Sequence, residues 1–267
     1  MQTPVVILTI AGSDPSGGAG IQADIKTISA LGGYAAAVIT AVTVQNTRGV
    51  TAVDYLPGTL VVAQTEAVLD DLHPTAVKIG MTGRADIITG LAASLSQYPY
   101  TPVVLDPVML SSSGHPLMKP DAAEALRTEL FPRCRLVTPN LNEASFLLGR
   151  SLHTLQDMEH AATELFQRYG CAFLLKGGHL DGEYMTDVLF DGQTHHFSSP
   201  RIHTDNLHGT GCTFSSAIAT HLGQGYSLPD SVQLAKAYMD KTIEAASQWR
   251  IGCGYGPLCH FPPNLNL

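Results

Sequence analysis

Short, continuously apolar runs alternate with helical patterns along most of the chain, and this alternation limits the possible folds more than any other feature. The apolar runs are residues 5–11, 36–44, 76–79, 103–106, 136–138 and 172–175. Such runs are typical of strands that are covered on both faces. The helical patterns between them are residues 19–31, 60–72, 85–95, 121–130, 142–148 and 155–169. The order predicts an α/β fold in three layers, with a mostly parallel central sheet.

The last third of the chain departs from this alternation. Residues 185–190 and 195–197 flank Asp191-Gly192, a pair typical of a hairpin turn. Two further helices are predicted at residues 212–222 and 229–249, and the segment from Gly252 onward is rich in glycine and proline and is predicted to be loop. We expect one domain spanning residues 1–267.

Composition excludes several classes of protein. With 45% hydrophobic and 14% charged residues, the chain can bury a full core, which excludes a disordered protein. The 15 Lys and Arg against 23 Asp and Glu give a formal net charge of 15 − 23 = −8. That balance argues against a general nucleic-acid binder and against a binder of anionic membranes. A small anionic substrate is still allowed, because it needs only a few local cations or amides.

Neither a membrane span nor a disulfide framework is expected. The longest apolar stretch, residues 35–44, is interrupted by Thr40 and Thr43 and is shorter than the roughly 20 residues a span needs. The first residues have no basic segment and no cleavage site, so they are interpreted as a buried strand and not as a signal peptide. The five cysteines include no Cys-x-x-Cys pair, and their number is odd. A reducing cytoplasm fits this pattern best.

The residues that follow the predicted strands share one character. In open α/β sheets a ligand lies beyond the carboxyl ends of the strands. Nearly all residues at these positions are polar, glycine or proline: Gly12-Ser13-Asp14, Gln45-Asn46, Gly80-Met81, Asp106-Pro107, Pro139-Asn140 and Lys176-Gly177-Gly178. Strand ends are commonly turns, so only the set as a whole predicts a ligand site at this edge.

The strongest local signal is the stretch His208-Gly209-Thr210-Gly211-Cys212-Thr213-Phe214, directly before an apolar helix. A Gly-Thr-Gly turn into a helix directs backbone N–H groups and the positive end of the helix dipole at one point, which favours an anion. We expect the pKa of Cys212 to fall at this helix start, so that its thiolate takes a proton from an attacking hydroxyl. The alternative is a glycine-rich loop with a buried, inert thiol.

A second glycine-rich stretch, Gly12-Ser13-Asp14-Pro15-Ser16-Gly17-Gly18-Ala19-Gly20, follows the first strand, and Asp24 lies one turn inside the next helix. Its glycines let the backbone approach a ligand closely. It matches neither the phosphate loop that ends in Gly-Lys-Ser/Thr nor the dinucleotide-binding spacing. The alternative is a flexible strand-to-helix connection.

A third signal is Asn140-x-x-Glu143 at a strand end. Side chains three residues apart lie on one side of a helical turn, and hard oxygen ligands there suit Mg²⁺ held through water. The alternative is a helix cap, with Asn140 or Asn142 as the N-cap. Asp106 offers a further carboxylate for the metal. Lys176, followed by two glycines, suits a phosphate tail, and its alternative is a tight turn into the hairpin.

These motifs, in this order and over essentially the whole chain, resemble the hydroxymethylpyrimidine/phosphomethylpyrimidine kinases of thiamine biosynthesis. The stretches that carry the resemblance are residues 11–24, Thr40-Ala41 with Gln45-Asn46-Thr47, Lys78-Ile79-Gly80-Met81, Leu105-Asp106-Pro107-Val108, Thr138-Pro139-Asn140 with Glu143-Ala144, Lys176-Gly177-Gly178-His179 and residues 208–217. The resemblance implies a ribokinase-like fold and a homodimer. It also implies ATP and Mg²⁺, used to phosphorylate an aminopyrimidine alcohol and then its monophosphate.

The resemblance also implies roles for individual residues. The pyrimidine pocket would be formed by Gly12, Asp24, Thr43, Gln45, Met81, Val108 and Cys212. Gln45 offers a donor and an acceptor to an aminopyrimidine edge, and Met81 and Val108 can enclose the ring. Gly209, Thr210, Gly211 and Cys212 would hold the transferring phosphoryl group, and Asn140 and Lys176 would contact the nucleotide. Ribokinase-like enzymes usually carry an aspartate as the base where this chain has Cys212.

Two other functions remain open. A pyridoxal or pyridoxine kinase of the same architecture would act on a ring alcohol of similar shape, and turnover on the two alcohols would discriminate between them. A non-catalytic sensor of a vitamin precursor would bind the pyrimidine without phosphoryl transfer. The presence of all the loop residues expected to bind ATP favours an enzyme.

Overall fold

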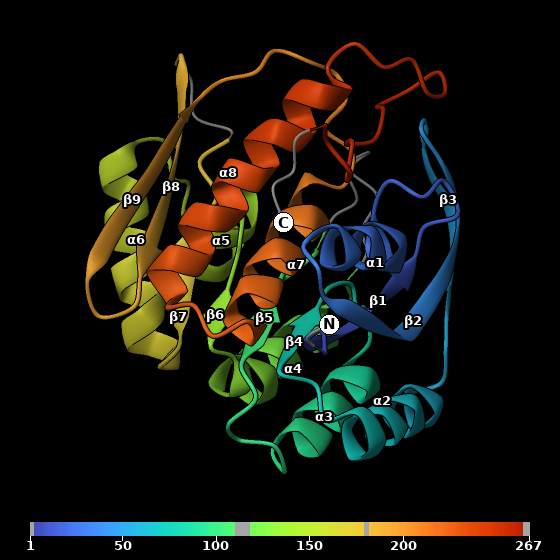
Figure 1. Ribbon diagram of the computed structural model, residues 1–267. Helices are drawn as coiled ribbons and strands as arrows, with labels where there is room; N and C mark the ends of the chain where they lie inside the picture. The colour runs from blue at the N-terminus through green and yellow to red at the C-terminus, as the bar shows by residue number, and fades with distance from the viewer. Residues whose placement is uncertain (1–2, 110–117, 179–181, 264–267) are drawn as a thin grey trace.

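The computed structural model describes residues 3–109, 118–178 and 182–263, so His179 of the predicted phosphate loop lies outside the described residues. Within these ranges one nine-stranded sheet runs through the molecule in the order β3-β2-β1-β4-β5-β6-β7-β8-β9 (Figure 1). The strands are β1 Val6–Ser13, β2 Tyr34–Asn46, β3 Gly49–Tyr55, β4 Ala76–Ile79, β5 Val103–Leu105, β6 Leu136–Val137, β7 Ala172–Leu175, β8 Tyr184–Phe190 and β9 Thr194–Pro200. The six central strands pair in parallel, and β3, β8 and β9 pair antiparallel at the two sides.

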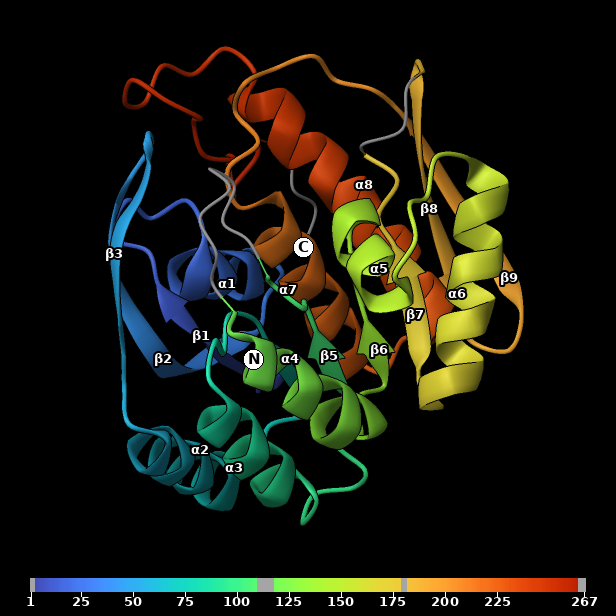
Figure 2. The same ribbon diagram turned by 180° about the vertical axis from the view of Figure 1, so that it is seen from behind.

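Helices cover both faces of the sheet, as Figures 1 and 2 show from opposite sides. The face seen in Figure 1 carries α1 Gly20–Ala30, α7 Thr210–Gly223 and α8 Leu228–Ala246. The other carries α2 Gly58–Leu72, α3 Ala85–Leu95, α4 Pro120–Ala125, α5 Leu141–Leu148 and α6 Leu155–Tyr169. A π-helical turn at Leu126–Leu130 and a 3₁₀ turn at Phe131–Arg133 follow α4. In the described part of the chain no helix is long and apolar enough to cross a membrane.

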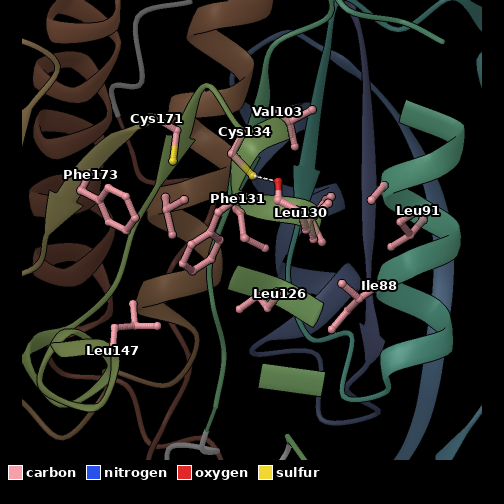
Figure 3. Packing of buried hydrophobic residues seen from close by; sticks show 14 of the residues in the cluster. Ile88, Leu91, Val103, Leu126, Leu130, Phe131, Cys134, Leu147, Cys171 and Phe173 are labelled. Carbon is pink, nitrogen blue, oxygen red and sulfur yellow. Dashed lines mark hydrogen bonds between the residues drawn. The ribbon is translucent and has the colours of Figure 1, made fainter. Parts of the chain in front are cut away.

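Each face of the sheet has its own hydrophobic core. Figure 3 shows part of the larger one, where the Phe131 ring meets the Phe173 ring edge-on at a centroid distance of 5.7 Å. In the same region the Cys134 thiol donates to the carbonyl oxygen of Leu130 at 3.3 Å, and burial raises the pKa of that thiol. Cys134 is therefore an inert packing residue. The two cores fix the sheet, and with it the positions of the loops at its carboxyl edge.

The alternation of apolar runs predicted this architecture correctly. All six runs form parallel strands, and the hairpin around Asp191-Gly192 is confirmed as β8 and β9. One strand, β3, was missed. It pairs with β2 after a turn in which the Asn46 side-chain oxygen accepts from the N–H of Arg48 at 2.9 Å and Gly49 has a φ of 144°. The same pairing extends β2 beyond the predicted end at residue 44, so that Gln45 lies in a strand and not in a loop.

Candidate active site

Loops from distant parts of the chain meet at the carboxyl edge of the central strands. Asn140, after β6, forms an isolated parallel bridge with Lys176, after β7. Lys176 in turn contacts Asp106, which follows β5. The prediction that polar strand-end residues gather at one edge is therefore confirmed for these three positions.

Helix α7 begins directly after a glycine whose backbone is left-handed. Gly209 has a φ of +86° and is the N-cap of the helix. A Cβ at this position would lie 1.8 Å from the carbonyl oxygen of Gly18 in the first glycine-rich loop. Residue 209 must therefore be glycine both for its φ and for the space available, and this glycine joins the two glycine-rich loops.

The first turn of α7 leaves two backbone donors free. The N–H of Thr210 turns back to the carbonyl oxygen of Leu207 at 3.3 Å. Those of Gly211 and Cys212 lack a helical acceptor, as first-turn groups do, and bond to no backbone acceptor in the described part of the chain. Gly211 and Cys212 thus leave two N–H groups available where the anion site was predicted, while the Thr210 N–H belongs to the preceding turn.

An ion pair lies over this helix start. Lys176 Nζ contacts Asp106 Oδ1 at 2.7 Å, and the two side chains are 17% and 4% exposed. A Cβ on Gly211 would lie 2.9 Å from Asp106 Oδ2 and 3.4 Å from Lys176 Nζ. Burial alone would lower the pKa of Lys176, but the charges of Asp106 and Glu143 raise it. A cation and two free N–H groups therefore face the same small space beside Gly211.

Glu143 caps helix α5 and lies near this cation. Its N–H donates to the Asn140 side-chain oxygen at 2.9 Å, and its own Oε2 accepts from the N–H of Asn140 at 2.8 Å. This is the capping alternative considered for Asn140-x-x-Glu143. Burial, reinforced by Asp106, raises the pKa of Glu143 to about 7, although Lys176 and the N–H groups of Asn140 and Met109 favour its charged form. Glu143 therefore titrates near neutral pH.

The side chains available as metal ligands limit how a metal ion can bind at this edge of the sheet. Among the residues that the structure describes, no three His, Cys, Asp or Glu side chains gather as a metal site. Asp106 and Glu143 are two hard oxygen ligands near Lys176, a set that would fit a hydrated Mg²⁺ held mainly by nucleotide phosphates and water. It does not fit a metal held by protein ligands alone.

The pKa of Cys212 differs from the prediction. Burial raises it to about 11, and the charges of Asp24 and Asp106 add to this effect. Lys78 and the N–H of Gly20 act in the opposite direction but do not compensate. The expectation of a lowered pKa is wrong for the ligand-free protein, because the loss of hydration outweighs the helix dipole. At neutral pH the thiol holds its proton.

Asp24 lies beneath the site and not at its surface. Its side chain is fully buried, and Lys78 Nζ donates to both of its carboxylate oxygens at 2.8 Å. Thr9 Oγ1 donates to Oδ2 at 2.6 Å and Ser216 Oγ to Oδ1 at 2.7 Å. With both oxygens occupied, Asp24 has no free acceptor for a substrate in this structure. The arrangement ties α1 to β4 and to α7 one turn after Cys212.

A small apolar cluster lies beside the first loop. Ala41 and Met81 are buried there, with Val108 and Tyr55 partly buried against them. A Cβ on Gly12 would lie 2.3 Å from the Met81 terminal methyl group, so this methionine packs directly on the loop backbone. Three of the residues predicted for the pyrimidine pocket, Gly12, Met81 and Val108, are therefore neighbours.

Gln45 and Thr43 add polar groups to this region. Both are on β2, and the Gln45 amide lies 3.1 Å from Thr43 Oγ1. The Thr43 hydroxyl donates to the carbonyl oxygen of Ser13 at 2.9 Å, which ties β2 to the first loop. The same Gln45 amide lies 3.3 Å from Nε2 of His208, the residue before Gly209. An apolar cluster with a directed amide at its edge suits a flat heteroaromatic ring.

Two residues of the site were not predicted from the sequence. Lys78 is a cation in an otherwise apolar strand, and that isolation was the signal for a buried ion pair. His208 was quoted only as part of the glycine motif. Its contact with Asp14, at 2.8 Å, joins residues 194 positions apart and has no local signature.

Comparison with known proteins identifies the family. The family model for phosphomethylpyrimidine kinase matches residues 14–259. The chain belongs to the phosphomethylpyrimidine kinase family. A hydroxymethylpyrimidine/phosphomethylpyrimidine kinase of Rhizobium meliloti (strain 1021) is 50% identical over 258 residues, covering 96% of this chain and 97% of that protein.

Solved structures in this comparison agree with the fold. The phosphomethylpyrimidine kinase from Clostridium difficile 630 is 43% identical with a TM-score of 0.78, over 88% of this chain and 98% of that one. The pyridoxal kinase from Staphylococcus aureus in complex with AMP-PCP and pyridoxal is 33% identical with a TM-score of 0.89, over 99% and 96%. The ribokinase-like fold that the sequence motifs implied is therefore confirmed for this member of the phosphomethylpyrimidine kinase family.

Proposed function

We propose that this chain uses ATP to phosphorylate 4-amino-5-hydroxymethyl-2-methylpyrimidine and then its monophosphate, giving the pyrophosphate used in thiamine biosynthesis. The observation that carries the proposal is the 50% identity, over nearly the full length of both chains, to a hydroxymethylpyrimidine/phosphomethylpyrimidine kinase. The site supports it, because the apolar cluster packs on the first loop, the same loop contacts the start of α7 at Gly209, and the Gln45 amide lies near His208 beside that glycine. Incubation with ATP, Mg²⁺ and a panel of ring alcohols, with the products identified by mass, tests it.

Different residues of the site would have different roles in phosphoryl transfer. The N–H groups of Gly211 and Cys212 would hold the transferring group, and Lys176 would leave Asp106 to contact the nucleotide phosphates. In the first reaction the substrate oxygen bonds to the γ-phosphorus as the bond to ADP breaks. The hydroxyl proton would pass to the sulfur of Cys212 in its thiolate form, which becomes a thiol. Asn140 would assist at the nucleotide.

ATP as the donor is supported by the similarity to a kinase bound to AMP-PCP. We propose Mg²⁺ as the metal, held through water by Glu143 with help from Asp106. When bound, it supplies positive charge to the nucleotide phosphates. Glu143 would hold this charge only in its ionised form, so metal binding would favour the ionised carboxylate.

Gln45→Ala should raise the KM for the pyrimidine about 10- to 100-fold, the effect of losing two hydrogen bonds to the ring. The KM for ATP should stay within about twofold, because the nucleotide phosphates bind at the other side of the site. Steady-state kinetics with each substrate varied in turn measures both values. Gln64→Ala, which removes a glutamine from the distant helix α2, is the control and should change neither. Equal shifts in both KM values would remove Gln45 from ring recognition.

Glu143→Gln should raise the Mg²⁺ concentration needed for half-maximal activity and lower kcat, since the amide keeps the shape and loses the charge. It should also flatten the pH dependence of stability. The pKa of Glu143 is raised in the folded state, so its contribution to stability is complete below its unfolded value of 4.5 and is lost as the pH rises through about 7. The wild-type protein should therefore lose stability over this window, and the variant should lose less.

Asp157→Asn is the matched control, because Asp157 forms the same kind of capping box with Thr154 at the start of α6, away from the site. It should lower the melting temperature slightly and leave the Mg²⁺ requirement unchanged. Titrations of activity against Mg²⁺ and melting curves at several pH values cover both variants. If Glu143→Gln behaves as Asp157→Asn does, Glu143 is a cap and not a metal residue.

A pyridoxal kinase is the second candidate function. Its support is the TM-score of 0.89 to a pyridoxal kinase, which is higher than the 0.78 to the phosphomethylpyrimidine kinase, although the identity is lower. An enzyme that phosphorylates both the pyrimidine alcohol and pyridoxal would be consistent with both structural similarities. The ratio of kcat/KM on the pyrimidine and on pyridoxal discriminates between the candidates. Pyrimidine binding without transfer would instead support a sensor.

We also propose the oligomeric state, the extent of the domain, the cellular compartment and the partners. The resemblance to the family supports a homodimer and a single kinase domain over residues 1–267. The five cysteines are free thiols, which supports a reducing cytoplasm. Neither nucleic acid nor membrane is proposed as a partner, in keeping with the net charge of −8. Sedimentation measurements on the purified protein test the dimer.

A further inference from the structure

His208 is a buried polar residue at the junction of three segments. It is 7% exposed. Its ring lies against the backbone of the first loop, where a Cβ on Gly18 would come within 2.4 Å of the ring carbon Cδ2. The backbone N–H of His208 donates to the carbonyl oxygen of Gly256, and the residue forms an isolated β-bridge with Pro257. The backbone of His208 is therefore fixed by the C-terminal segment, and its ring packs against the first loop.

The contact with Asp14 fixes where the proton of this ring lies. His208 Nε2 is 2.8 Å from Asp14 Oδ2. Burial alone would raise the pKa of Asp14, but hydrogen bonds from His208 and Ser16 lower it, so this carboxylate is ionised and accepts only. A carboxylate at 2.8 Å from an unprotonated ring nitrogen would set lone pair against lone pair. His208 must therefore carry a proton on Nε2 and donate it to Asp14.

This proton determines the orientation of the Gln45 amide. In the structure the amide nitrogen lies 3.3 Å from the same Nε2 atom and the amide oxygen lies 3.1 Å from Thr43 Oγ1, but the two ends of an amide are assigned only by their hydrogen bonds. The single hydroxyl proton of Thr43 is used in its 2.9 Å bond to the Ser13 carbonyl. That orientation sets the amide N–H against the Nε2–H of His208 and leaves the amide oxygen without a proton from Thr43, so hydrogen counting turns the amide over: its oxygen faces His208, where it shares the Nε2 proton with Asp14, and its NH₂ group faces Thr43.

We propose that His208 is a specificity-positioning residue, which sets the donor and acceptor pattern that Gln45 presents to the ring of the substrate. With one amide hydrogen on Thr43 and the oxygen facing His208, Gln45 has one N–H and one oxygen lone pair left for a ligand. An aminopyrimidine edge offers a ring nitrogen and an amino group in the matching order. The inference rests on the proposed function for the identity of the ring, and it adds a residue that does not itself touch the substrate.

The central experiment is a double-mutant cycle of His208→Ala and Gln45→Ala on the full chain. His208→Ala should lower kcat/KM for the pyrimidine about 10-fold or more, with the KM for ATP within about threefold of wild type. In the His208→Ala background, Gln45→Ala should add less than about threefold, because the amide has already lost its orientation. His208→Gln, which restores a donor for Asp14, should recover part of the loss. Independent effects that multiply would overturn the proposal, as would an equal rise in the KM for ATP.

His221→Ala is the matched control, since His221 is a buried histidine on the same helix α7 that contacts Gln224 and not the site. It should leave the KM for the pyrimidine unchanged. A second measurement needs no variant and no activity: the nitrogen chemical shifts of His208 in the wild-type protein report which ring nitrogen is protonated. An unprotonated Nε2 would overturn the proposal even if the enzyme phosphorylates the pyrimidine. A protonated Nε2 in a chain that does not phosphorylate it would instead count against the proposed function.

Discussion

Replacing Cys212 with alanine should lower kcat for the first phosphorylation by about 10²–10⁴-fold, the usual contribution of a general base. The second phosphorylation should fall much less. Its acceptor is a phosphate monoester, whose second pKa is about 6, so at pH 8 it has no proton to lose. Single-turnover assays with the alcohol and with its monophosphate separate the two reactions. A loss of equal size in both would assign Cys212 to binding the phosphoryl group and not to proton removal.

The raised pKa of Cys212 predicts the sign of the pH dependence. With a pKa of about 11, a fraction of about 10⁻⁴ of the thiol is ionised at pH 7. A base acts only in its ionised form, so the first phosphorylation should speed up as the pH rises toward 11. That rise should disappear in Cys212→Ala. Cys253→Ala, which removes an exposed thiol, is the control and should keep the wild-type profile. A wild-type rate that is flat above pH 8 would contradict the role of the thiol.

The parts of the fold that depend on local periodicity were predictable. The apolar runs that became β4 and β7 matched the strands to the residue, because strands buried on both faces consist almost entirely of apolar residues, with Lys78 as the exception in β4. Strand β3 was missed because it lies at the sheet edge, where its mixture of exposed and partly buried residues leaves no clear period. Its turn did have a signal, an asparagine three residues before a glycine, but only pairing with β2 makes those residues a strand.

The candidate site was predictable in position and less so in its electrostatics. Asp106 and Lys176 lie in contact as expected, because both follow parallel strands whose carboxyl ends meet at one edge of the sheet. The ion pairing of Asp24 and the pKa of Cys212 depend on burial, which cannot be read from the sequence. Asp24 is buried in an ion pair with Lys78, and the Cys212 thiol loses its hydration. Glu143 shows that a helix cap does not exclude a second role, since its capping box is formed while the same carboxylate lies near Lys176 and Asp106.

Replacing Gly211 with alanine should lower kcat by about 10²-fold for both phosphorylations, because alanine keeps the N–H group but its methyl group would displace the transferring group, and a misplacement of about 1 Å has an effect of this size. The added methyl group would lie 2.9 Å from Asp106 Oδ2 and 3.4 Å from Lys176 Nζ, in the space where the transferring group meets the helix start. Unlike Cys212→Ala, this change should affect the two reactions alike, because both transfer the same group through the same place.

The melting temperature separates this effect from misfolding. Gly211 lies inside the first turn of α7 without a positive φ, so alanine suits its backbone and should not destabilise the helix. Gly209→Ala is the contrasting variant. Its φ of +86° and the 1.8 Å approach to the Gly18 carbonyl should make the alanine protein melt at a clearly lower temperature. The approach to Asp106 requires that side chain to shift, so we expect lost activity with a small change in melting temperature at position 211, and a clearly larger loss of stability at position 209. Near-normal kcat in Gly211→Ala would show that phosphoryl transfer takes place elsewhere than at the start of α7.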